Sequence, residues 1–192
     1  YSFTPNKILG GISDGGMAVT RSRQLRKKLN ILRQPQSNNP LLLKSLRTPA
    51  FLKWDQIAFI KCKMKYLKKW IKRRKEIAGI YFEAFKDTSL ILPGIDKNAH
   101  HIYSDFVVRL DKRDKFQRYL KLRGIETDIH HIPPVHLSST YKCLGHKKGD
   151  FPISEETCSK IISLPVNQFL TGNEIEYIIK KVKAFLNKPI LV

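Results

Sequence analysis

The sequence predicts an α/β protein in two parts, and three observations lead to this fold class. Helix and strand patterns alternate over residues 89–192, as in a compact α/β layer. A long run with helical spacing precedes them, and a Pro-Gly turn at residues 93–94 follows that run. The 192 residues are 42% hydrophobic and 10% aromatic, which is enough to bury a core. We therefore expect two domains, at residues 1–88 and 89–192.

The first 20 residues contain turn-forming residues and one short strand. The turns are marked by Pro5, Gly10, Gly11, Gly15 and Gly16. Met17–Thr20 is predicted as a strand. After it, Gln24–Arg33 places three leucines on one face and predicts a short helix. The composition of Gln34–Pro40 predicts a loop.

One long amphipathic helix is predicted from Ile57 to Phe85. Apolar residues recur there at spacings of three and four, which places them on one face. The polar face is crowded with lysine and arginine side chains between Lys61 and Lys75. A helix with this pattern buries one face and exposes the other.

The part after the long helix begins with a strand, a helix and a second strand. His101–Leu110 is predicted as the first strand. Asp114–Arg123 is predicted as a helix that ends at Gly124. Ile125–Ile132 is predicted as the second strand.

Two further helices are predicted toward the C-terminus. Ser154 is expected to cap a helix that runs to about Ile162, and Ser163–Val166 is expected to be extended. A capping box at residues 171–174 predicts the start of the last helix, whose apolar positions form one face as far as Leu186. Strand and helix therefore alternate throughout this half.

The chain is strongly basic, and the excess charge lies in one segment. Lys and Arg number 36 against 16 Asp and Glu, a net charge of +20. Residues 21–75 hold 18 of the basic residues and one acid, Asp55, so this segment carries +17. Such a segment attracts polyanions, and Trp54, Tyr66 and Trp70 could stack on nucleic-acid bases. Lysines on an amphipathic helix usually form a solvated face, however, and without a known nucleic-acid motif we do not expect nucleic acid as the partner.

Several protein classes are excluded by composition. No run of about 18 apolar residues is present, so we expect no membrane span. The start of the chain lacks the pattern of a signal peptide. Three widely spaced cysteines without a CxxC pair predict reduced thiols in a cytoplasmic protein, with no disulfide framework and no metal site. Because Tyr1 begins a stretch typical of the middle of a domain, we expect part of a longer chain.

Lys7 is the first candidate for a catalytic residue. It follows a proline turn in a weakly charged stretch, where its amine could be partly desolvated. Burial favours the neutral amine, which is the form that attacks carbonyl groups. The alternative is that Lys7 is one more surface lysine of a very basic protein.

Two motifs near the N-terminus, with a series of landmarks after them, match a known pattern. Residues 1–7 read YSFTPNK and residues 11–20 read GISDGGMAVT. The landmarks lie at residues 101–103, 124–127, 129–131, 134–136, 151–155, 163–165 and 170–171. Together they resemble the Ser-Phe-x-x-x-Lys motif, the Gly-Asp-Gly-Gly-x-x-x-Thr motif and the small domain of the DegT/DnrJ/StrS family of nucleotide-sugar aminotransferases. The resemblance covers the whole chain, but only the second half of a family member.

This resemblance implies a fold and a set of site residues. The fold is that of pyridoxal-phosphate transferases like aspartate aminotransferase (fold type I), with this chain forming the end of the large domain, a connecting helix and a small α/β domain. Lys7 would bond covalently to pyridoxal 5′-phosphate and move a proton between the donor carbon and the cofactor. Ser2 would hydrogen-bond the cofactor phosphate. His130 and His136 would lie near the sugar entrance, or else they are ordinary strand and loop histidines.

The resemblance also implies a reaction and partners. An amino group, usually from glutamate, is transferred to a keto group of a nucleotide-linked deoxysugar for polysaccharide or aminosugar biosynthesis. A homodimer is expected for the whole protein. The family's preceding half carries the aspartate that pairs with the pyridine nitrogen, the ring-stacking residue and the phosphate loop. None of these can be assigned in this chain.

The sequence departs from the family pattern inside the basic segment. Residues 48–53 (TPAFLK) lack the asparagine that usually precedes the long helix. Residues 56–58 (QIA) and 63–64 (KM) stand where Gln-Ala-Ala and Gln-Leu are usual. Either this member has drifted where its dimer contacts should be, or it no longer makes a working site. Two alternatives to an active enzyme therefore stay open: a truncated inactive relative, because half of the family's site is absent, and a basic module that binds polyanions, because of the +17 segment.

Overall fold

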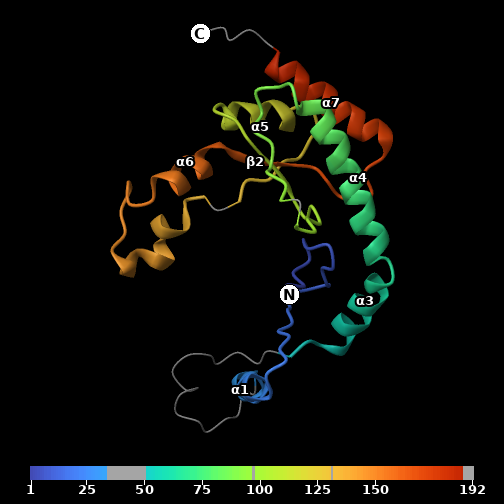
Figure 1. The fold of residues 1–192 in the computed structure, drawn as a ribbon, viewed down its shortest axis with the longest axis vertical. Coiled ribbons are helices and arrows are strands. Elements are labelled where there is room, and N and C mark those ends of the chain that lie inside the picture. Colours follow the sequence, from blue (N-terminus) through green and yellow to red (C-terminus); the bar gives the residue numbers. More distant parts are fainter. Residues whose placement is uncertain (34–50, 97, 131, 188–192) are drawn as a thin grey trace. The chain divides into compact units, whose positions relative to one another are not determined.

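The computed structural model describes residues 1–33, 51–96, 98–130 and 132–187 (Figure 1). The chain divides into two compact units, Tyr1–Lys69 and Trp70–Val192. The loop predicted at Gln34–Pro40 and the residues at 48–50 lie outside the described residues. The boundary predicted near residue 88 concerns the domains of the whole protein, and it stays a prediction.

The first unit combines an N-terminal turn with helices α1 (Arg23–Arg33) and α3 (Trp54–Met64). Its first 17 residues double back on themselves, and an isolated bridge joins Ser2 to Gly16. The predicted strand at Met17–Thr20 is wrong, because only Met17 is hydrogen-bonded to the opposite segment and no described residue pairs with the other three as a strand. The predicted helix at Gln24–Arg33 is confirmed.

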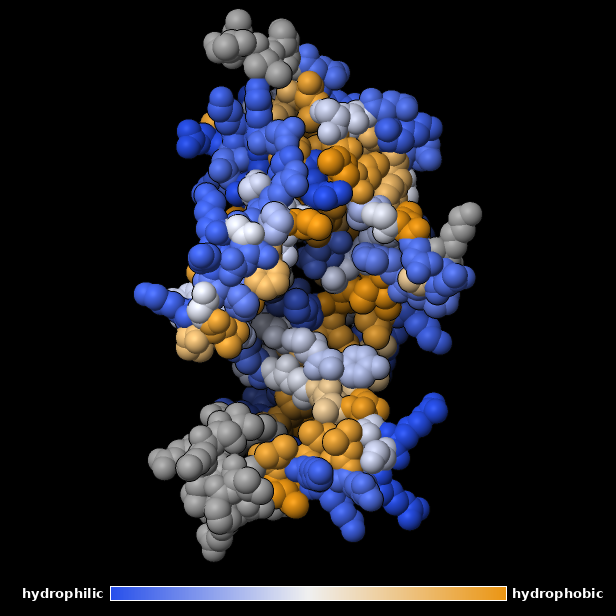
Figure 2. All heavy atoms as spheres, turned by 60° about the vertical axis from the view of Figure 1, so that its left-hand side comes forward, coloured by the Kyte–Doolittle hydropathy of each residue, from blue (hydrophilic) through white to orange (hydrophobic). Residues whose placement is uncertain are grey.

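Few side chains of the first unit are buried. Phe3, Ile8 and Ile60 are the buried apolar residues among those described here, and α1 buries none of its residues. Large apolar side chains are exposed instead, including Ile12, Met17, Val19, Leu25, Phe51 and Trp54. Figure 2 shows hydrophobic side chains at the surface in its lower part, the end at which Figure 1 shows α1. This unit therefore presents apolar surface that a folded protein normally covers.

The predicted long helix is interrupted, so it forms two helices. α3 ends at Met64 and α4 runs from Leu67 to Phe85. Between them, the amides of Lys65 and Tyr66 bond to carbonyls three residues back, at 3.3 and 3.0 Å. Such bonds tighten the turn relative to an α-helix and end α3. The prediction of one continuous helix is wrong at this point, although the predicted apolar face is buried in the second half of α4.

A two-stranded antiparallel sheet lies at the centre of the second unit. β1 (Phe106–Arg109) pairs with β2 (Ile161–Leu164), with Phe106 opposite Leu164 and Arg109 opposite Ile161. The remaining elements are α5 (Arg113–Lys121), two short 3₁₀ helices η1 (Val135–Leu137) and η2 (Ser139–Leu144), α6 (Pro152–Lys160) and α7 (Gly172–Leu186). The mixed α/β fold class is thus confirmed.

The core of the second unit joins α4, α5 and α7 to both strands. Its fully buried large side chains are Ile77, Tyr81, Phe85, Val108, Phe106, Phe116, Leu120, Ile162 and Val182. The ring of Tyr81 lies 5.2 Å from that of Phe106 and 5.6 Å from that of Phe85. Because each element contributes at least one of these residues, the core holds the unit together.

Both predicted strands of this unit are shorter than expected. β1 forms only at Phe106–Arg109, because the carbonyls of Tyr103 and Ser104 accept hydrogen bonds from the Arg74 guanidinium instead of joining a sheet. Tyr103 also has a φ of 48°, which interrupts an extended chain. Among the described residues of the strand predicted at Ile125–Ile132, one bridge forms, between Asp128 and Ser163. β2 is too short to extend that pairing, since Pro165 follows it and has no N–H to donate.

The predicted helices of this unit are present, although the bounds of α6 differ from the prediction. α5 is confirmed, and Gly124 after it has a φ of 71°, as expected where a helix ends. α6 starts at Pro152, so Ser154 is not its cap, and Ile161 and Ile162 belong to β2. The capping box of α7 is confirmed, with Thr171 Oγ1 accepting from the amide of Glu174 at 3.3 Å.

The described residues also bear on the membrane and cysteine predictions. None of their helices is long and apolar enough to cross a bilayer. Cys62, Cys143 and Cys158 are free cysteines in the structure, two of them exposed.

Tyr81 makes the unfolding of this unit sensitive to alkaline pH. Its buried hydroxyl donates to the Pro165 carbonyl at 2.8 Å, and burial raises the pKa of Tyr81 well above its usual value. The unfolded state therefore ionises at a lower pH than the folded state, so stability is lost as pH rises above about 10. We expect Tyr81→Phe to cost about 1–2 kcal/mol in the free energy of unfolding at pH 8, because the Pro165 carbonyl loses its donor.

Urea unfolding at pH 8 and pH 10.5 checks this expectation. The variant should lose less stability between the two pH values than the parent chain does. Tyr177→Phe is the control, because the hydroxyl of Tyr177 also donates to a carbonyl, that of Arg123, but its side chain is exposed. Equal pH dependence in the parent and in Tyr81→Phe would contradict the prediction.

Candidate active site

Lys7 lies on a short closed turn at the N-terminus, which we call the Lys7 turn (residues 3–11). The amide of Gly11 donates to the Phe3 carbonyl at 2.7 Å and closes the turn. Inside it, the Lys7 amide donates to Thr4 at 2.9 Å, and the Gly10 amide donates to Lys7 at 2.7 Å. The backbone on both sides of Lys7 is therefore fixed by local hydrogen bonds.

The side chain of Lys7 is exposed. The described residues of this chain therefore do not bury Lys7, in contrast to the partial desolvation predicted for it. The amine is accessible to a carbonyl compound from solution.

Ser2 lies at the entry of the same turn. Its hydroxyl shares a hydrogen bond of 2.8 Å with Thr4 Oγ1 and accepts from the Thr4 amide at 3.3 Å. The side chain is exposed, so the hydroxyl can still reach an anion from outside. The turn thus carries an amine and a hydroxyl within a few residues of each other, which are the two groups that the sequence predicts.

Helix α3 supports this turn through two polar side chains that the sequence does not reveal. Gln56 Oε1 accepts from the amides of Ile12 and Ser13, and its Nε2 donates to the Ser13 carbonyl. Lys63 Nζ donates to the Gly10 carbonyl at 2.6 Å, and burial lowers the pKa of Lys63. No local motif indicates either contact, because the partners lie more than 40 residues apart in sequence.

The two candidate histidines belong to the second unit, and each faces its own carboxylates. His130 Nε2 lies 3.5 Å from Asp105 and 3.6 Å from Asp128, and the side chain is 36% exposed. Asp105 and Asp128 also line a polar cleft of about 310 Å³, together with Arg74, Thr127, Ser163 and Asn167. His130 is thus placed beside a cleft. His131, its neighbour in the resemblance, lies outside the described residues.

His136 is held more tightly than His130. Its Nε2 lies 3.0 Å from Glu155 Oε1, its side chain is 10% exposed, and its ring packs on Phe151. Glu155 also accepts from the amide of Gly149 at 2.8 Å. This backbone hydrogen bond, with the bond from His136, lowers the pKa of Glu155. His136 therefore links η1 to α6 through Glu155. It shares no carboxylate partner with His130, which lies near Asp105 and Asp128.

Arg74 is a third residue whose role the sequence did not reveal. It is buried, and its guanidinium donates to Gln168 Oε1 and to the carbonyls of Tyr103 and Ser104. Burial lowers the pKa of Arg74, and Asp105 partly offsets this effect. The prediction that the basic residues between Lys61 and Lys75 lie on the polar face is wrong for Arg74, which is buried and lines the cleft beside His130.

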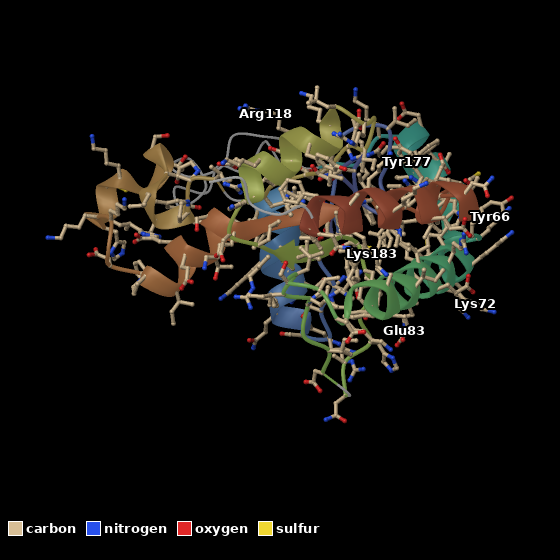
Figure 3. All side chains as sticks on the ribbon, turned by 90° about the horizontal axis from the view of Figure 1, so that it is seen from above. Tyr66, Lys72, Glu83, Arg118, Tyr177 and Lys183 are labelled. Carbon is tan, nitrogen blue, oxygen red and sulfur yellow. The ribbon has the colours of Figure 1, made fainter. Side chains whose placement is uncertain are left out.

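Other basic residues of the segment do form an exposed face. Lys61, Lys65, Lys68, Lys69, Lys72 and Lys75 are exposed on α3, α4 and the turn between them. Within the described residues, none of these six forms an ion pair. Figure 3 shows Lys72 pointing away from α4. Trp70 packs edge-on against Phe169, so it is engaged in the second unit rather than open for stacking on bases.

A family model matches almost the whole chain. It is described as the DegT/DnrJ/EryC1/StrS aminotransferase family, and it matches residues 1–183. The residues of the Lys7 turn, both candidate histidines and the cleft lie inside this range.

Curated relatives and solved structures agree with this match. EryC1 of Saccharopolyspora erythraea, an erythromycin biosynthesis sensory transduction protein, is 34% identical over 96% of this chain and 50% of its own length. The dTDP-3-amino-3,6-dideoxy-alpha-D-galactopyranose transaminase of Aneurinibacillus thermoaerophilus is 34% identical over the same shares. The crystal structure of DesV from S. venezuelae superposes with a TM-score of 0.88 at 28% identity, over 98% of this chain and 51% of that one. The chain spans about half the length of the curated relatives it matches.

Proposed function

Because the chain belongs to the DegT/DnrJ/EryC1/StrS aminotransferase family, we propose that it supplies the catalytic lysine of a pyridoxal-phosphate-dependent nucleotide-sugar aminotransferase. The observation that carries the proposal is the Lys7 turn. It presents an accessible amine on a backbone fixed on both sides, with the Ser2 hydroxyl at its entry. The same residues make up the motif that resembles the family.

The groups present on this turn fit pyridoxal phosphate. An accessible primary amine is what the cofactor's aldehyde needs, and an exposed hydroxyl is a suitable donor to a phosphate oxygen. Lys7 would hold the cofactor covalently and, when displaced by the amino donor, move the proton at the donor carbon. Ser2 would orient the phosphate. The cofactor itself supplies the electron sink for this chemistry.

The proposed substrates follow from the relatives. Two of them are named as transaminases of dTDP-linked amino sugars. We therefore propose a nucleotide-linked keto sugar as the acceptor, with glutamate as the amino donor, in a cytoplasmic homodimer. His130, whose side chain is 36% exposed beside the polar cleft, is the better candidate for a sugar contact than His136, whose side chain is 10% exposed.

The activity proposed here needs more than these 192 residues. The first unit exposes apolar side chains and buries only a few, so it is suited to packing against further polypeptide. The group that pairs with the pyridine nitrogen and the phosphate loop have no counterpart assigned in this chain. We therefore place the reaction in the complete polypeptide that carries this chain.

Trapping of the cofactor tests the proposal directly. The complete folded polypeptide is incubated with pyridoxal phosphate, reduced with borohydride and mapped by peptide mass spectrometry. We expect the label on Lys7, with little on exposed lysines such as Lys65. Label on another side chain would overturn the assignment. No label would favour an inactive relative, and no label together with tight, salt-sensitive binding to single-stranded DNA would favour the polyanion alternative.

A further inference from the structure

The Lys7 turn has few anchors of its own. Within the described residues, its buried apolar side chains are Phe3 and Ile8, and Lys7 itself points to solvent. The hydrogen bonds inside the turn close it, and the backbone bond that joins it to a later described residue, from the Phe3 amide to the Gly15 carbonyl at 2.7 Å, holds only its start. Something outside the turn must therefore hold it in place.

Gln56 supplies one such anchor just after the turn. Its side chain is only 2% exposed, and three hydrogen bonds satisfy its amide. Oε1 accepts from the amides of Ile12 and Ser13 at 2.8 and 3.2 Å, and Nε2 donates to the Ser13 carbonyl at 2.5 Å. Gly11 leaves the space for it, since a Cβ there would lie 2.3 Å from Nε2. The glycine is thus needed for the approach of Gln56.

Lys63 supplies the second anchor, at the end of the turn. It lies seven residues after Gln56, two helical turns along the same face of α3. Its Nζ donates to the Gly10 carbonyl at 2.6 Å and lies 5.3 Å from the centre of the Phe59 ring. The charge-assisted bond and the half-buried side chain make this contact stronger than a surface hydrogen bond.

From these contacts we infer that Gln56 and Lys63 are positioning residues for Lys7. One helix, α3, binds Gly10 near the end of the Lys7 turn and Ile12 and Ser13 directly after it. α3 thereby fixes the place of Lys7 without touching its side chain. The inference rests on the proposed function of Lys7. Misplacement of a reacting group by about 1 Å can cost about 10²-fold in rate, so loss of an anchor should affect the chemistry before it affects the fold.

Lys63 is the better residue for a test, because loss of the buried Gln56 could unfold the first unit. Lys63→Met keeps the length of the side chain and removes the donor, and Lys63→Arg restores a donor. Lys65→Met is the matched control, since Lys65 is exposed two residues later. Gln56→Glu is the second variant, because it keeps the acceptor oxygens and loses the donor to Ser13.

Two measurements on the complete polypeptide decide the inference. In Lys63→Met, amide exchange at Lys7 and Gly10 should rise about tenfold, although neither amide bonds to α3. The share of borohydride-trapped cofactor on Lys7 should fall as the share on other lysines rises, with the melting temperature unchanged. Lys63→Arg should restore both values, Lys65→Met should change neither, and Gln56→Glu should act in the same direction as Lys63→Met.

The outcomes separate this inference from the function on which it rests. If the parent polypeptide carries no label on Lys7, the proposed function fails. If the parent is labelled on Lys7, and Lys63→Met and Gln56→Glu are labelled equally with unchanged exchange at Lys7 and Gly10, the positioning role is overturned. If exchange rises only in proportion to a lower melting temperature, Lys63 is merely structural and the inference is likewise overturned.

Discussion

Lys7→Ala is expected to lower kcat for transamination by the complete polypeptide by about 10²–10⁴-fold or more. The variant loses both the amine that would hold the cofactor and the base that would move the proton at the donor carbon. Its fold should be intact, because Lys7 is exposed and its hydrogen bonds to other described residues are those of its backbone. We expect its free energy of unfolding to change by less than about 0.5 kcal/mol.

Single-turnover kinetics with the amino donor and urea unfolding check this result together. Lys65→Ala is the control, because it removes another exposed lysine of the first unit and should leave kcat unchanged. Lys7→Arg keeps the positive charge but cannot bond to the cofactor, so it should be as inactive as the alanine variant. A Lys7→Arg enzyme with near-parental kcat would show that only charge is needed at this position.

Much of the second unit could be predicted from sequence because its signals are local. The capping box of α7 and the glycine after α5 act within a few residues, and both helices form where the patterns place them. The effect of such signals depends on contacts within one helical turn and not on distant parts of the chain. The apolar face of α4 is also confirmed, because its spacing depends only on the helix itself.

The strands could not be delimited in this way because their ends depend on distant residues. Arg74 of α4 takes the carbonyls of Tyr103 and Ser104, so β1 starts later than its β-forming sequence suggests. The segment around Asp128 meets only one residue of β2, since the pairing partner is short. A pattern of alternating residues indicates that a segment can be extended, but not which neighbour is available to it.

In the candidate site, too, the residues of a local motif could be predicted and those that act through distant contacts could not. Lys7 and Ser2 are found from a contiguous motif, whereas Gln56 binds a turn 43 and 44 residues away. Gln56 is the glutamine of the usual Gln-Ala-Ala, so that stretch departs from the family pattern at Ile57, whereas Lys63 stands where the glutamine of Gln-Leu is usual. Both side chains bind the N-terminal segment, Gln56 at Ile12 and Ser13 and Lys63 at Gly10. The departure at Lys63 therefore keeps a polar contact to the Lys7 turn, which weakens the argument from it for an inactive relative.

The second unit should depend heavily on Phe106. Phe106→Ala is expected to lower the free energy of unfolding by about 3–5 kcal/mol, because the ring is fully buried and its removal leaves a cavity. The ring lies 5.2 Å from Tyr81 and 5.3 Å from Phe82, so the loss would also break the aromatic contacts between β1 and α4. A loss of this size is a large share of the about 5–15 kcal/mol by which folded proteins are stable, so the urea concentration at which the second unit unfolds should fall markedly.

Phe169→Ala is the control for Phe106→Ala, because it makes the same substitution at an exposed position. Phe169 is 70% exposed and makes one ring contact, with Trp70 at 6.0 Å, so its loss should cost less than about 1 kcal/mol. Urea unfolding followed by amide exchange in α4 and β1 measures both variants on the same elements. If the two substitutions cost the same, the packing of α4 against β1 is not what holds this unit together. If only Phe106→Ala exposes the α4 amides to exchange, the helix depends for its stability on the core it covers rather than on its own propensity.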